Sequence, residues 1–156
     1  PNGIGKSTFL RSLVSAEYEG ASILNGVRVG YYSQDFSTLN FSHTVFESLK
    51  EAAAPGINEQ EMMNVAGGFM VAGSLLGQNV GALSEGQKGL LSFARLVLMR
   101  PALLVLDEPT NHINFRHIPV IAEAINDFEG AIIMVSHMPE FAREIRFDNE
   151  LDLGKI

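Results

Sequence analysis

The sequence of 156 residues has no cysteine, no long apolar run and no basic cluster, and each absence narrows its possible roles. Without cysteine no disulfide bond can form, which fits a cytosolic protein. No apolar run approaches the roughly 20 residues of a membrane-spanning helix. No secretory leader is visible in these residues, and the first residue is not methionine. We therefore expect a cytoplasmic protein that is not inserted directly into a membrane.

Acidic residues outnumber basic residues, 18 against 11, which gives a net charge of −7. This balance argues against a broad footprint on the phosphate backbone of nucleic acid, and any RNA contact would need a local basic patch. Apolar residues make up 46% and charged residues 19%, which is ordinary for a soluble globular protein. The length allows a sizeable core, so residues 1–156 are expected to form one domain.

The most informative stretch runs from residue 83 to residue 111. Within it, the apolar run 102–106 ends in Asp107 and Glu108. An aliphatic run without alternation predicts a strand buried on both faces, as in a parallel α/β sheet. Ligands bind beyond the carboxyl ends of such strands, so both acids are candidate site residues. The alternative is an acid pair that only decorates a surface or a helix cap.

A candidate phosphate loop lies at the start of the sequence. The first eight residues, PNGIGKST, fit all but the first glycine of the pattern G-x-x-x-x-G-K-[ST]. Glycines let backbone N–H groups close around phosphate oxygens at the start of a helix. Lys6 would reach the β- and γ-phosphates and the Ser7 hydroxyl would ligate Mg²⁺. The alternative is a chance glycine-rich turn. The predicted ATP-binding residues are Asn2, Gly3, Gly5, Lys6, Ser7 and Thr8.

Apolar periodicity and turn signals predict the remaining elements. Asn58 and Ser84 are expected helix N-caps, and Gln87 would complete a capping box with Ser84. The cations Lys88, Arg95 and Arg100 are interpreted as surface residues. Predicted helices cover residues 6–16, 43–54, 59–66, 84–100, 119 (or slightly earlier) to 128, and 141–146. A hairpin covers 23–29, and its second strand continues to Gln34. A mobile connection covers 67–81, and further strands cover 102–106, 131–135 and 150–156.

The order of the motifs resembles the nucleotide-binding domain of the ATP-binding cassette (ABC) family. The phosphate loop is followed by a glutamine loop (YYSQD, residues 31–35) and a signature (LSEGQ, residues 83–87). The strand ending in Asp107-Glu108 and the histidine His137 come next. The resemblance implies an α/β P-loop NTPase fold, with a mostly parallel sheet flanked by helices. It also implies a small helical subdomain at approximately 42–98.

The resemblance assigns a role to each motif residue. Glu108 would be the general base, and His137 would hydrogen-bond the γ-phosphate and position the attacking water. Gln34 would contact Mg²⁺ and water and so sense the γ-phosphate. The metal would be Mg²⁺, held by Ser7, Gln34 and Asp107 together with ATP. The signature would act in trans, on ATP bound by the opposite subunit of a head-to-tail pair, so a second cassette is the implied partner. The implied signature residues are Ser84, Glu85, Gly86 and Gln87.

Two segments look like the ABC-F class, whose members are soluble twin-cassette ATPases that mostly act on ribosomes. These segments are DEPTNH at 107–112 and GFMVAG at 68–73. The ribosome is therefore a possible partner. Two other functions remain open: an ATP-binding subunit of an ABC transporter, and a truncated or degenerate cassette that serves as a non-catalytic interaction module.

Several positions depart from the family pattern. Glu85 replaces a glycine of the signature, and its carboxylate is expected to repel the partner's γ-phosphate and weaken ATP-driven dimerisation. Asn114 replaces the usual aspartate of the interface loop, and Met138 stands where ABC-F proteins commonly have aspartate. The strands that precede the phosphate loop in this family are missing from residues 1–156. We therefore expect this piece to bind ATP poorly and to leave sheet edges open.

Overall fold

A parallel three-stranded sheet organises the described part of the chain. The computed structural model describes residues 6–15, 23 and 26–149. The strands lie in the order β1-β2-β3, with Val29 beside Leu103 and Leu103 beside Ala131. This confirms the predicted α/β fold with a parallel sheet. The strands are β1 (Val29–Tyr32), β2 (Leu103–Asp107) and β3 (Ala131–Val135).

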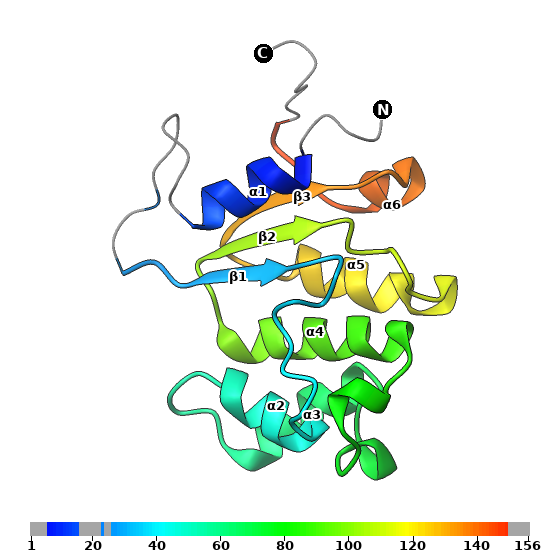
Figure 1. Ribbon diagram of the computed structural model, residues 1–156. Helices are drawn as coiled ribbons and strands as arrows, with labels where there is room; N and C mark the ends of the chain where they lie inside the picture. Colours follow the sequence, from blue (N-terminus) through cyan, green and yellow to red (C-terminus); the bar gives the residue numbers. More distant parts are fainter. Residues whose placement is uncertain (1–5, 16–22, 24–25, 150–156) are drawn as a thin grey trace.

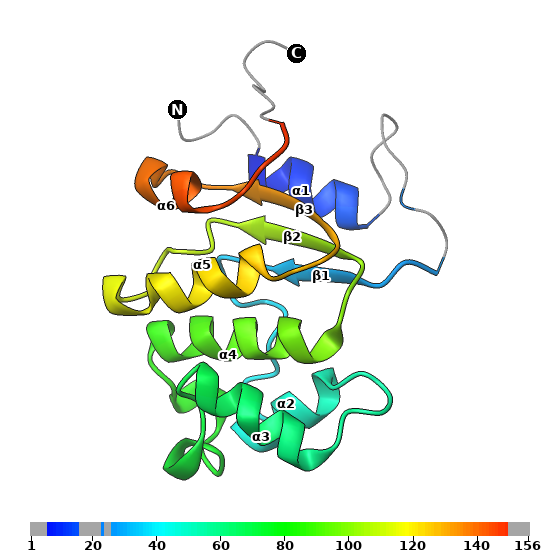
Figure 2. The ribbon, with the colours of Figure 1, turned by 180° about the vertical axis from the view of Figure 1, so that it is seen from behind.

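Helices cover the sheet and extend the molecule away from it (Figures 1 and 2). Helix α1 lies on one side of the sheet, and α4 and α5 lie on the other. Helices α2 and α3 lie beyond α4, which is thus enclosed between them and the sheet. The helices are α1 (Lys6–Val14), α2 (Val45–Ala52), α3 (Glu59–Gly68), α4 (Glu85–Met99), α5 (Ile118–Asn126) and α6 (Pro139–Glu144).

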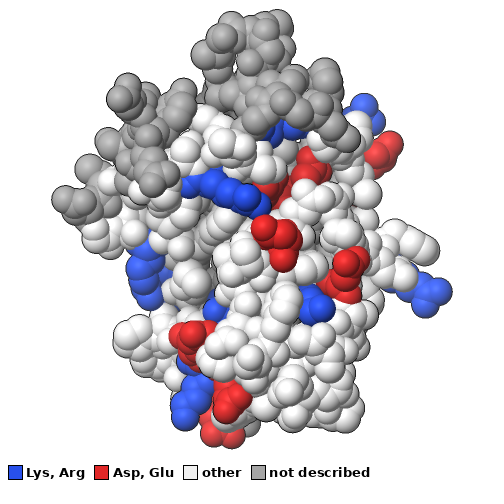
Figure 3. Space-filling view, viewed as in Figure 1, with Lys and Arg blue, Asp and Glu red and all other residues white. Residues whose placement is uncertain are grey.

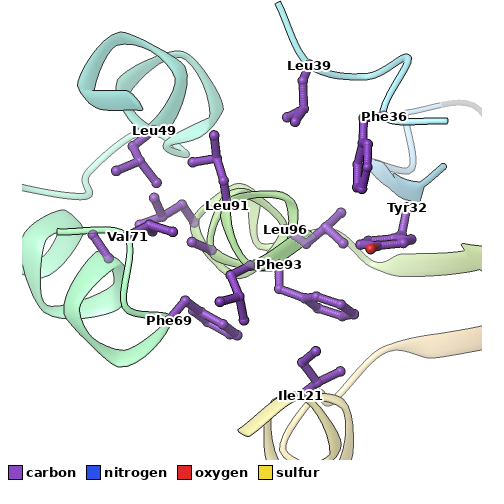
Figure 4. Close-up of a cluster of buried hydrophobic side chains, with 14 of the residues drawn as sticks. Tyr32, Phe36, Leu39, Leu49, Phe69, Val71, Leu91, Phe93, Leu96 and Ile121 are labelled. Atoms are coloured by element: carbon purple, nitrogen blue, oxygen red, sulfur yellow. The ribbon is translucent and has the colours of Figure 1, made fainter. Parts of the chain in front are cut away.

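Helix α4 forms the centre of the hydrophobic core, because it is apolar on more than one face. Figure 4 shows Leu91 pointing toward the side of α2 and α3, and Leu96 pointing toward Tyr32 of β1. The ring of Phe93 packs 4.9 Å from that of Tyr32 and 6.3 Å from that of Phe69, measured between centroids. A helix enclosed on both sides needs apolar residues on both, as seen here.

Local capping sets where the helices begin. Thr44 and Ser84 each form a capping box, with Glu47 and Gln87 respectively, and the side chain of Asn58 caps α3. The predicted caps at Asn58 and Ser84 are therefore confirmed. Such caps satisfy N–H groups that have no partner inside the helix. Three short 3-10 helices lie at Gly73–Leu75, Val80–Ala82 and Phe115–His117.

The structure corrects several details of the sequence prediction. Helix α6 begins at Pro139, two residues earlier than predicted, because proline is well suited to the first turn of a helix. Strand β3 has the predicted bounds and, unlike β2, is only partly buried. Arg95 is not a surface cation: its side chain is 12% exposed and is bound to α2. Strand 150–156 and most of hairpin 23–29 lie outside the described residues.

The surface is mixed in charge. On the face shown in Figure 3, Lys and Arg side chains are scattered among Asp and Glu side chains. No helix in the described part of the chain has the length and apolar character needed to cross a membrane.

Candidate functional site

The predicted site residues converge at the carboxyl edge of the sheet. Gln34 follows β1, Asp107 ends β2 and His137 follows β3. Because the three strands are parallel, the loops after them lie along one edge. Lys6 starts α1, the helix that packs against β2.

Asp107 and Glu108 are both buried, with residue exposures of 1% and 6%. Asp107 Oδ1 and Glu108 Oε1 each accept no hydrogen bond within the described structure. An unpaired buried carboxylate oxygen is unfavourable, so each oxygen is available to an incoming ligand. Glu108 also has a left-handed backbone, φ 51°, which is uncommon for a residue with a side chain.

Glu108, His137 and Lys6 form one cluster. The His137 backbone N–H donates to Glu108 Oε2 at 2.9 Å, and His137 Nε2 lies 3.2 Å from Glu108 Oε1 without a hydrogen bond. The same Nε2 is 3.0 Å from Lys6 Nζ. The structure thus joins the phosphate-loop lysine to the histidine expected at the end of β3.

The glutamine loop is held by Asp35. Its carboxylate accepts hydrogen bonds from the Ser33 hydroxyl and from the Ser37 backbone N–H, the latter at 3.1 Å. Arg11 of α1 forms an ion pair with the same carboxylate at 2.9 Å. The hydroxyls of Ser33 and Ser37 hold the pKa of Asp35 at about 2, with Arg11 adding a smaller effect. Gln34, between Ser33 and Asp35, is exposed.

The signature residues form the first turn of α4. Ser84 Oγ accepts from the Gln87 backbone N–H at 3.2 Å, and Gln87 Oε1 accepts from the Ser84 N–H at 2.9 Å. Glu85 Oε2 lies 2.8 Å from Nδ1 of His112. The turn therefore contacts the loop after β2 in its own chain.

A cavity of about 330 Å³ brings several motifs together. The proposed Mg²⁺ residues Ser7, Gln34 and Asp107 line it, and so does Glu85 of the signature. Thr8 is exposed on α1, whereas Asn2, Gly3 and Gly5 lie outside the described residues. Motif reasoning missed four lining residues: Arg11, Asp35, Phe36 and His112. Asp35 and His112 lie inside recognised segments, Phe36 directly follows the glutamine loop, and Arg11 lies three residues after the phosphate loop, which is the signal that could have found them.

Comparisons of the sequence with known proteins identify its family. The profile of the family described as "ABC transporter" matches residues 1–111. ATP-binding protein YdiF of Bacillus subtilis is 36% identical over 148 residues, which cover 93% of this chain and 23% of that protein. ATP-binding cassette sub-family F member 3 of Mus musculus is 35% identical over 150 residues, or 91% of this chain and 20% of the relative. The chain thus spans about a fifth of these relatives.

Solved structures share the fold. An archaeal ribosome recycling factor, solved with a ribosomal stalk protein, has a TM-score of 0.72 at 23% identity and covers 93% of this chain and 29% of that chain. A dimeric ATP-binding cassette bound to ADP and Pi has a TM-score of 0.70 at 17% identity, covering 92% and 75%. Fold, motif order and sequence identity agree: the chain belongs to the ATP-binding cassette family of ATPases and is similar to its F subfamily.

Proposed function

We propose that this cassette hydrolyses ATP at composite sites formed with a second cassette in a head-to-tail pair. The observation that carries the proposal is the buried pair Asp107 and Glu108, each with one oxygen that lacks a hydrogen-bond partner in the described structure. A ligand at the carboxyl edge of the sheet would relieve this unfavourable burial.

The residues at the site fit Mg²⁺, a hard cation that prefers oxygen ligands. Asp107, Ser7 and Gln34 line the same cavity, and their side chains can offer carboxylate, hydroxyl and amide oxygens. No three His, Asp or Glu side chains of the described residues gather as a metal site, so phosphates and water would complete the coordination. When bound, Mg²⁺ would neutralise charge on the β- and γ-phosphates.

The other residues would act by positioning and by proton transfer. Glu108 would accept a proton from the attacking water. Its left-handed backbone sets the direction in which its side chain leaves the main chain. His137, anchored to Glu108 through its backbone N–H, would hydrogen-bond the γ-phosphate. Lys6 would move from His137 to the phosphates. Asn2, Gly3, Gly5 and Thr8 are proposed to complete the phosphate loop.

A second cassette would complete the site in trans. The signature residues Ser84 to Gln87 start α4, whose N-terminus favours an anion such as phosphate. Residues 42–98 are proposed as the helical subdomain that carries this turn. A single cassette then holds two half-sites, so a monomer should be a poor ATPase.

A role on the ribosome is the more specific part of the proposal. It is supported by the F-subfamily relatives and by the recycling factor solved with a ribosomal stalk protein. A cytoplasmic location would accompany it. An ATP-binding subunit of a transporter is the second candidate, supported by similarity to an ATP-binding subunit of an ABC transporter, TM-score 0.74 at 22% identity.

The decisive experiment compares the full-length protein with its Glu108→Gln variant. We expect loss of ATP turnover and accumulation of an ATP-bound dimer, and an exposed control, Glu129→Gln, should behave as wild type. Equal turnover in Glu108→Gln would remove this residue from the chemistry. Cosedimentation of the trapped variant with ribosomes, in ATP but not in ADP, would support the ribosomal role, and binding to a permease instead would favour transport.

A further inference from the structure

Glu85 stands where the family signature has glycine, and its carboxylate is engaged within its own chain. Its Oε2 lies 2.8 Å from His112 Nδ1, and the two side chains are 65% and 37% exposed. His112 belongs to the loop between β2 and the 3-10 helix at Phe115–His117. The side chain that is expected to face a second cassette therefore contacts a histidine of its own chain.

His112 is fixed in place from several sides. Its backbone is left-handed, with φ 66°. Its ring centroid lies 6.1 Å from that of Phe36 in the loop after β1. Its carbonyl oxygen lies against Gly86, where an added Cβ would be only 3.1 Å away. The ring thus lies between the glutamine loop and the signature turn, and it meets Glu85 from a defined position.

We infer that His112 is a positioning residue for the signature: it binds the Glu85 carboxylate and keeps it from the γ-phosphate of a nucleotide on the partner cassette. The inference rests on the proposed composite site. A free carboxylate close to a phosphate would repel it in a poorly screened interface. The contact with His112 offsets that repulsion, so Glu85 is compatible with a closed pair of cassettes.

This role predicts that the effect of removing His112 depends on the charge of residue 85. Removal of His112 harms pairing only while residue 85 carries a charge. If His112 instead merely supports the fold of its loop, its removal is equally harmful whatever residue 85 is. A double-mutant cycle separates the two because it measures the coupling between the residues directly.

The experiment uses the full-length protein with Glu108→Gln in every sample, so that ATP-bound dimers accumulate. Dissociation constants of the dimer in Mg-ATP are measured by analytical ultracentrifugation for the parent, His112→Ala, Glu85→Gln and the double variant. We expect His112→Ala to weaken the dimer about tenfold. Glu85→Gln should match or exceed the parent, and the double variant should match Glu85→Gln. His112→Gln, which keeps a side-chain donor, should recover part of the loss.

Thermal unfolding of each variant checks that the fold persists. Equal weakening by His112→Ala in both backgrounds would overturn the inference, as would a dimer weakened by Glu85→Gln. If no sample dimerises in Mg-ATP, the composite site itself is wrong, and the inference falls with it. That result differs from one in which the dimer forms but its dissociation constant does not depend on His112.

Discussion

Lys6 and His137 are hydrogen-bonded to each other, with 3.0 Å between Nζ and Nε2. A lysine ammonium can only donate, so Nε2 accepts in this pair. ATP, on the proposed roles, would separate the two groups by drawing both to its phosphates. A nucleotide that recruits Lys6 and His137 would therefore have to break this hydrogen bond first.

His137→Ala should change nucleotide binding little, because the loss of a proposed γ-phosphate contact is offset by the release of Lys6 from its hydrogen bond with His137. Turnover should fall by about 10²-fold, the lower end of the loss when one hydrogen-bond donor to the developing negative charge is removed. Competition with a fluorescent nucleotide measures binding, and phosphate release measures turnover. His117→Ala serves as the matched control. A large loss of binding in His137→Ala alone would contradict the competition between nucleotide and histidine.

Two capping boxes offer a matched pair of substitutions. Ser84→Ala and Thr44→Ala remove equivalent caps, from α4 and α2 respectively. Each should destabilise the protein by about 1 kcal/mol in urea unfolding. Only Ser84→Ala should also reduce ATP turnover, since Ser84 is proposed to contact ATP in trans. Similar turnover in the two variants would show that Ser84 acts only as a cap.

Asp35 predicts an acid dependence of stability. Its pKa is lowered from 3.8 to about 2, mainly by the hydroxyls of Ser33 and Ser37. A depressed carboxyl pKa contributes stability above its unfolded value, and that stability disappears as the pH falls through the folded value. Wild type should therefore exceed Asp35→Asn in stability at pH 7, and the gap should close between about pH 4 and pH 2.

Urea unfolding across this range, with the exposed Asp148→Asn as control, tests the assignment. A gap that stays constant with pH would rule out titration of Asp35 as its source. A gap that widens on acidification would reverse the sign and reject the hydrogen-bond explanation.

Arg95→Met should be strongly destabilising. The guanidinium Nη1 donates to the Ser48 carbonyl and hydroxyl, each at 2.7 Å, and to Glu51 at 3.0 Å. Methionine keeps much of the volume but leaves these acceptors without their donor, which should cost about 2–3 kcal/mol in unfolding free energy. Exposed Arg116→Met, the control, should change it by less than about 0.5 kcal/mol. Equal losses of unfolding free energy in the two variants would show that the hydrogen bonds of Arg95 to α2 do not stabilise the fold.

Features encoded within a few residues could be predicted from the sequence. The caps at Asn58 and Ser84 depend on hydrogen bonds between side chains and backbone N–H groups three residues apart, and the bounds of β3 follow from one apolar run. The parallel sheet followed from the unalternating run at 102–106. In each case the residues that determine the structure lie within one short segment of the sequence.

Contacts between distant segments could not be predicted in the same way. Arg95 has the helical position of an exposed cation, and only the packing of α2 on α4 buries it beside Ser48. Likewise Glu85 and His112 become partners only because the loop after β2 folds against the first turn of α4. Sequence periodicity describes one element at a time and contains no information on such pairs.

The left-handed backbone of Glu108 has a consequence for how the protein can change over time. A residue with a side chain costs roughly 1–2 kcal/mol in that conformation, and glycine or asparagine there would be less strained. If selection acted on folding alone, Glu108 would thus tend to be replaced by glycine or asparagine. The resulting cassette would be at least as stable but, on the role proposed for Glu108, inactive. On the role proposed for it, Glu108 is a point where stability and activity trade against each other, and its presence reflects selection for chemistry.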